Sequence, residues 1–166
     1  TIYCIAAYEE MFDPARTSPD WCFTQLMVKG IVSAARKHDM TVNIAPMATT
    51  LDAFKRIAVP GSSMCIFLNY NTCEQLVEYA VKKQIPYSLY INDPIHRKLN
   101  LVFCDVGKAS MDNMWKYYNF PTPLTTMDMH LEQAGEALLE NLLKKARDGK
   151  DRQQTIPYSL SQGETA

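Results

Sequence analysis

The chain has 166 residues, a length that fits one domain or two small lobes and allows a substantial core. Its 17 basic and 18 acidic residues leave a formal net charge of -1, which favours neither nucleic acid nor an anionic membrane as the direct partner of this segment. The apolar runs are far shorter than a bilayer span, and residues 1–7 have the pattern of a strand rather than a signal peptide. Five cysteines without a CxxC pair indicate a reducing compartment.

Short apolar runs alternate with helical patterns along the first two thirds of the chain. Runs at 2–7, 41–45, 64–68, 87–91 and 101–104 predict strands that are buried on both faces. Apolar residues at helical spacing predict helices over 24–38 and 72–83. This succession predicts an α/β fold, with a parallel sheet flanked by helices on both faces.

The last third contains one long helical pattern. A helix is expected over 109–118, before a turn segment whose Pro121 and Pro123 exclude a continued helix. The longest helix is expected over 128–147 and ends before Gly149, with basic residues at its negative end. Residues 155–160 are expected to add a last strand.

Polar and aromatic residues follow several of the predicted strands. Ligands of open parallel sheets bind outside the carboxyl ends of the strands, so these residues are candidates for a binding site. Amides and carboxylates suit the hydroxyls of a sugar, and an aromatic ring stacks on its apolar face. Each has a structural alternative, because Asn and Asp are common in turns and at helix caps, and Trp21 is equally compatible with the core. The candidates are Trp21, Phe23, Asn69, Asn92, Asp93 and Asp105.

Catalytic signatures are missing from the sequence. GxSxG, P-loop and GxGxxG motifs do not occur, and His38, His96 and His130 are scattered without metal-ligand spacing. We therefore expect no enzyme, no catalytic residue, no metal site and no cofactor.

Two motifs resemble a known family. Residues 123–127 read Pro-Leu-Thr-Thr-Met and are followed by an apolar helix with Gly135 near its start. Together with 156–160, Ile-Pro-Tyr-Ser-Leu, they resemble the end of the effector core of LacI/GalR transcription regulators. The aromatic-led first helix, with Gly30-Ile31 at its centre, is also similar to that family. The family usually places an arginine after the terminal strand, where this chain has Gly-Glu-Thr-Ala at 163–166.

The resemblance implies a periplasmic-binding-protein-like (type I) fold that retains its N-lobe and a remnant of its C-lobe. Residues 1–118 correspond to the first N-lobe segment, 119–147 to its returning segment, and 148–166 to the terminal strand and tail of the C-lobe. The DNA-binding head and most of the C-lobe, about one small lobe by length, are expected to be absent from this sequence, with the junction between Tyr118 and Asn119. Two alternatives stay open for the C-lobe: it is deleted, or it belongs to the molecule outside this sequence.

The resemblance also implies a function. It predicts the effector-binding core of a cytoplasmic LacI-type repressor that binds a small sugar, acts as a homodimer and reaches operator DNA through a head domain outside this chain. By family position, Met129 and Leu131 are also expected to face the effector. Two alternatives stay open: a sugar-binding receptor of a transporter with the same fold, and a single-lobe interaction module.

Overall fold

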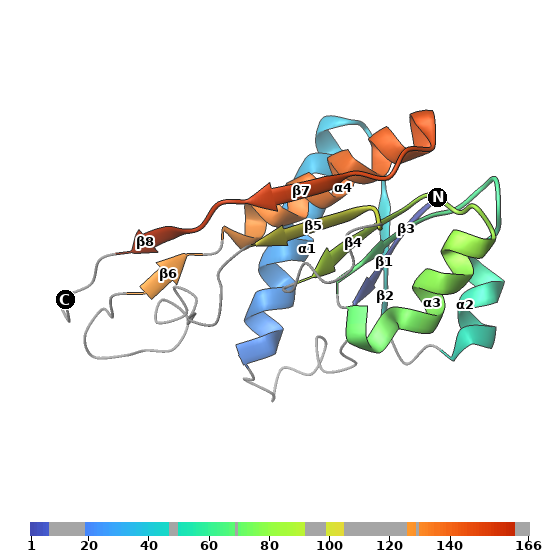
Figure 1. Ribbon diagram of the computed structural model, residues 1–166, viewed down its shortest axis with the longest axis horizontal. Coiled ribbons are helices and arrows are strands. Elements are labelled where there is room, and N and C mark those ends of the chain that lie inside the picture. Colours follow the sequence, from blue (N-terminus) through green and yellow to red (C-terminus); the bar gives the residue numbers. More distant parts are fainter. Residues whose placement is uncertain are drawn as a thin grey trace.

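A computed structural model describes residues 1–6, 19–46, 50–68, 70–91, 99–104, 126–128 and 130–161 of the protein. Six strands form a parallel sheet in the order β2-β1-β3-β4-β5-β7 (Figure 1). Two further strands, β6 (Thr126–Asp128) and β8 (Ser159–Ser161), form a small antiparallel sheet. The strands of the main sheet are β1 (Ile2–Ala6), β2 (Val42–Pro46), β3 (Met64–Phe67), β4 (Tyr87–Ile91), β5 (Leu101–Cys104) and β7 (Gln153–Ile156).

Helices cover both faces of the main sheet. Helices α1 (Pro19–Lys37) and α4 (Leu131–Asp148) lie on one face, and α2 (Leu51–Ile57) and α3 (Tyr70–Lys82) on the other (Figure 1). The α/β class and the five expected strands are confirmed, with ends that differ by at most one residue. The expected helix over 109–118 lies outside the described residues.

Several helix boundaries differ from those expected. Helix α1 begins at Pro19 rather than at residue 24, and α4 begins at Leu131 rather than at residue 128, because 126–128 pairs with β8 as a strand. Helix α2 was not predicted. It has only seven residues, with Thr50 as its N-cap, whose hydroxyl accepts a hydrogen bond from the Ala53 amide at 3.3 Å.

The tail differs most from expectation. The single strand expected over 155–160 is two strands, β7 and β8, which lie in different sheets and are separated by Pro157 and Tyr158. Strand β7 pairs with β5 in the main sheet. The chain therefore does not pass to another sheet at residue 148, where the segment assigned to the C-lobe was expected to begin. The three-part domain division itself stays a prediction.

Two clusters of buried side chains hold the layers together. Met27, Ile31 and Leu138 belong to the cluster beneath α1 and α4, while Phe54 and Phe67 belong to the cluster beneath α2 and α3. The two phenylalanine rings meet at 5.8 Å between centroids. Strand β4 is buried along its whole length, as expected for the interior of a doubly covered sheet.

Helices α1 and α4 cross at two glycines. A Cβ atom on Gly30 would clash with the carbonyl of Glu132, and one on Gly135 would clash with the carbonyl of Met27, both well inside 3.0 Å. The two backbones therefore touch directly at the crossing. Glycine is needed at both positions because any side chain there would push the helices apart.

Two lysine–glutamate ion pairs and one histidine–glutamate contact flank this crossing on the exposed side. Lys29 Nζ lies 2.6 Å from Glu132 Oε1, Lys37 Nζ lies 3.0 Å from Glu136 Oε2, and His38 Nε2 lies 2.6 Å from Glu140 Oε1. Each pair joins residues that lie about a hundred positions apart in sequence, so α4 is tied to α1 at successive turns.

A buried asparagine connects three strands at the amino end of the sheet. Asn100 Nδ2 donates to the carbonyl of Tyr87 at 2.6 Å, and Asn100 Oδ1 accepts from the Arg152 amide at 2.9 Å. Burial raises the pKa of the nearby Tyr87 phenol to about 12. Asp151 Oδ1 lies 3.4 Å from the Tyr87 hydroxyl and 2.6 Å from Lys145 Nζ. This network fixes the starts of β4, β5 and β7 relative to one another.

Candidate functional site

The carboxyl ends of the central strands lie at one edge of the sheet. Ile5 pairs with Phe67, Phe67 with Leu89, and Ile91 with Phe103, so β1, β3, β4 and β5 end at nearly the same level. Because all are parallel, the segments that follow them leave the sheet at this edge. This is the edge at which open α/β sheets bind ligands.

Three helices begin at the same edge. Helices α1 and α3 follow β1 and β3 in the chain, and Figure 1 shows the first turns of α1 and α4 near the strand tips. The positive ends of these helix dipoles and the amide groups of their first turns therefore lie at the candidate site. Such an edge favours oxygen-rich ligands that accept hydrogen bonds.

Only part of the predicted sugar site falls on described residues. Trp21 and Phe23 lie in the first two turns of α1, at the predicted edge, although nothing is described of their side chains. Leu131 is the first residue of α4, and its side chain is 4% exposed within the cluster beneath α1 and α4. Its contact with an effector stays a prediction. The remaining candidates, Asn69, Asn92, Asp93, Asp105 and Met129, lie outside the described residues.

A polar pair not predicted from the sequence lies beside this edge. His130 Nε2 and Ser159 Oγ are 2.9 Å apart and join the start of α4 to β8. His130 adopts the left-handed conformation, with φ 49° and ψ 51°, and occupies the N-cap position of α4 without a side-chain cap hydrogen bond. Its ring is therefore directed to the small sheet instead of the helix. No sequence signal marks this pair, because Ser159 is 29 residues away.

Two cysteines in the described strands are buried. Burial raises the pKa values of the Cys4 and Cys65 thiols to about 12, so both stay protonated and neither is a thiolate nucleophile at neutral pH. In the described part of the chain, no three His, Cys, Asp or Glu side chains come together to hold a metal ion. Among the same residues, no helix is both long and apolar enough to cross a membrane.

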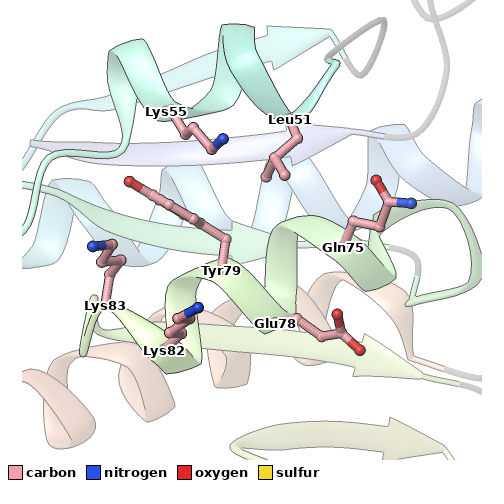
Figure 2. Close-up of a pocket in the computed structure, with 7 residues that line it drawn as sticks. All are labelled: Leu51, Lys55, Gln75, Glu78, Tyr79, Lys82 and Lys83. Atoms are coloured by element: carbon pink, nitrogen blue, oxygen red, sulfur yellow. The ribbon is translucent and has the colours of Figure 1, made fainter.

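A groove lies on the opposite face of the sheet, between α2 and α3. It has a volume of about 720 Å³, and Figure 2 shows its side chains arranged around the ring of Tyr79. This groove was not predicted from the sequence, because one of its two walls is α2, which was not predicted either. The sequence feature that could have indicated the groove is the Lys82-Lys83 pair at the end of α3, its other wall.

No protein-family model matches this sequence, and no curated protein matches it. Solved structures do match. A LacI family transcriptional regulator from Enterococcus faecium with bound ribose has a TM-score of 0.71 at 10% identity, over 99% of this chain and 98% of that chain. The transcriptional regulator CelR in complex with cellobiose has a TM-score of 0.68 at 8% identity, over 99% of this chain and 84% of that chain. The chain has the fold of the LacI-family regulators.

This LacI-type fold confirms the expected fold class. A periplasmic binding ribose operon repressor protein from Lactobacillus acidophilus, with a TM-score of 0.51 at 10% identity, shares it over 99% of this chain and 97% of that chain. These three similar structures are of transcriptional regulators or repressors. At identities near one residue in ten, the likeness establishes the fold alone, and the ligand must be argued from the site.

Proposed function

We propose that this chain is the effector-binding core of a LacI-type transcriptional repressor and that its effector is a small sugar. The observation that carries the proposal is the common edge at which four parallel strands end and α1 and α4 begin. In an α/β sheet this edge is the ligand edge. Two solved regulators of the same fold hold ribose and cellobiose.

The roles of the side chains follow from their chemistry. Trp21 and Phe23, at the start of α1, stack on the apolar face of the sugar ring. The carboxylates and amides after the strands accept and donate hydrogen bonds to its hydroxyls, and Met129 and Leu131 close the apolar side of the site. The residues proposed for the hydroxyls are Asn69, Asn92, Asp93 and Asp105. The chain binds its effector without converting it.

Regulation requires that the sugar bind two arrangements of the protein with different affinity. In the complete cytoplasmic protein, a homodimer reaches operator DNA through head domains outside this chain, and the sugar changes the affinity for DNA. The small β6–β8 sheet is joined to the start of α4 by the contact between His130 and Ser159. We place the moving joint there.

The proposal is tested by thermal unfolding of the purified chain against ribose, cellobiose, glucose and galactose at millimolar concentration. A sugar present at a hundred times its dissociation constant stabilises the native state by about 2.7 kcal/mol, which raises the melting temperature by about 5 °C or more in a chain of this length. Isothermal titration calorimetry on the responding sugar then gives the affinity directly.

Substitutions locate the site. Asp93→Asn is expected to weaken binding of the responding sugar at least about tenfold, because it replaces a charged hydrogen-bond acceptor. The matched control is Asp39→Asn, an exposed position in the turn after α1 at the opposite edge, where the affinity should not change. Trp21→Ala should abolish the sugar-induced shift. A sugar panel without any shift would contradict the proposal, and wild-type affinity in both site variants would move the site elsewhere.

A further inference from the structure

The groove between α2 and α3 combines an apolar floor with basic walls. Leu51 contributes from the start of α2, and the ring of Tyr79 reaches across from α3 (Figure 2). The edge of this ring packs against buried Phe54, with centroids 6.0 Å apart and planes at 80°. The floor is therefore held in place by the core and does not depend on a ligand for its shape.

The charges around the floor are mostly positive. Lys55 lies on one side of the Tyr79 ring, with Nζ 5.9 Å from the ring centroid, and Lys82 and Lys83 lie on the other (Figure 2). Among the described residues that line the groove, Glu78 is the one acidic side chain, against three lysines. Since the whole chain carries a net charge of -1, this local excess is a property of the groove.

Several other lysines of the protein are neutralised by a nearby carboxylate. Lys29, Lys37 and Lys145 each have a carboxylate within 3.0 Å. Lys82, the last residue of α3, and Lys83, which follows it, have no carboxylate within 4.0 Å among the described residues. Lys55 pairs with the exposed Asp52, at 3.4 Å, so the groove lysines without a carboxylate partner in the described part of the chain are the two on the α3 side. The groove therefore has positive charge that its own walls do not neutralise.

The shape of the groove favours a polymer over a small molecule. Sites for small molecules enclose most of the ligand within largely apolar walls. Here the apolar part is one ring and one leucine on an open floor, and the cations stand at the rim. An extended or helical segment that alternates carboxylates with apolar side chains meets both features at once, with apolar residues on Tyr79 and acids on the lysines.

We propose that this groove docks an acidic segment of a partner protein, in which aspartate or glutamate residues flank a leucine-like side chain. The groove lies across the sheet from α1 and α4, and its lysines stand at the ends of α2 and α3 rather than at their starts. It is thus separate from the sugar edge and does not depend on the proposed effector.

The test uses the full chain and a fluorescein-labelled peptide in which glutamate alternates with leucine, followed by fluorescence anisotropy. The double variant Lys82→Glu/Lys83→Glu is expected to weaken peptide binding at least about tenfold, because two attractive charges become repulsive. The matched control, Lys144→Glu/Lys150→Glu, makes the same change in charge at exposed positions of and beside α4 and should bind like wild type. Circular dichroism spectra and melting temperatures of both variants establish that they are folded.

The salt dependence of binding and competition experiments distinguish an acidic peptide from other occupants of the groove. Peptide affinity should fall as sodium chloride rises, and the unlabelled peptide should displace the probe, while inorganic phosphate at the same concentration should not. Equal loss in the two double variants would overturn the proposal, because binding would then follow net charge alone. Displacement by phosphate, tighter binding of a single-stranded oligonucleotide, or self-association of the wild type that Lys82→Glu/Lys83→Glu abolishes would each overturn the assignment to an acidic peptide.

Discussion

Replacement of Gly135 by alanine tests the close crossing of α1 and α4. In an ordinary exposed helix this change stabilises the protein by about 1 kcal/mol, because alanine restricts the unfolded chain and favours the helix. At Gly135 the new methyl group would instead overlap the carbonyl of Met27 and approach the amide of Ile31 at 3.0 Å. The two effects have opposite signs, so the sign of the measured change decides between them.

The size of the stability loss in Gly135→Ala depends on how far α4 must move to accommodate the methyl group. Both neighbours of the new methyl group are backbone atoms, so no side-chain rotation relieves the clash, and α4 must shift by roughly an ångström away from α1. Such a shift loosens contacts throughout the cluster that contains Met27, Ile31 and Leu138, whose side chains are at most 1% exposed. Overpacking of this kind costs about 1–3 kcal/mol and sometimes more. With rigid backbone on both sides, we expect a net loss of about 3 kcal/mol after the helix preference is included.

The assay is equilibrium unfolding in urea, followed by circular dichroism, together with the melting temperature, which should fall by about 6–12 °C. Gly149→Ala is the control. It has φ 72° but nothing within 4 Å of a new Cβ, so it should cost only about 1 kcal/mol of backbone strain. The double variant Gly30→Ala/Gly135→Ala should lose less than the two single losses combined, because one separation of the helices relieves both clashes. A Gly135→Ala protein as stable as wild type would refute the close crossing.

Two further predictions concern buried polar groups. Asn100→Ala should destabilise the protein by about 3 kcal/mol in urea unfolding, because one buried and one partly buried backbone group lose their partner, whereas Asn43→Ala on the exposed side of β2 should change little. A near-neutral Asn100→Ala would mean that water replaces the amide. The Cys4 and Cys65 thiols, with pKa values raised to about 12 from 9.0, should resist iodoacetamide in the native protein near neutral pH and react only after unfolding, as read by peptide mapping. Since the folded-state pKa is the higher one, their contribution to stability is complete below pH 9.0 and is lost as the pH rises toward 12, so an alkaline titration without a fall in the urea midpoint would contradict their burial.

The main strands and long helices could be predicted because their patterns are long and local. An apolar run such as 87–91 is buried on both faces, and the leucine stripe of α4 repeats over several turns. Helix α2 was not predicted because its seven residues include too few apolar positions to show a helical period. Strand β7 is mostly exposed and polar, with only Ile156 buried, so its place beside β5 depends on pairing and not on its own composition.

The candidate site could be predicted in position but not in detail. The rule for parallel sheets selects an edge from strand order alone, and the described strands end there as expected. The pair of His130 and Ser159 depends on the meeting of α4 with β8, and the basic groove depends on the spacing of α2 and α3. Both arise from contacts between segments far apart in sequence, which no local pattern encodes.

The glycine crossing also selects one alignment of α4 against α1. Glu132, Glu136 and Glu140 are spaced by four residues, so a slip of α4 by one turn would bring the next glutamate opposite Lys29 and Lys37. The charge pattern alone therefore tolerates several alignments. A one-turn slip in either direction would place Leu131 or Leu139 where Gly135 meets the backbone of Met27, and neither fits. The buried cluster holds the helices together, and the absence of a side chain at Gly135 determines which turn faces which.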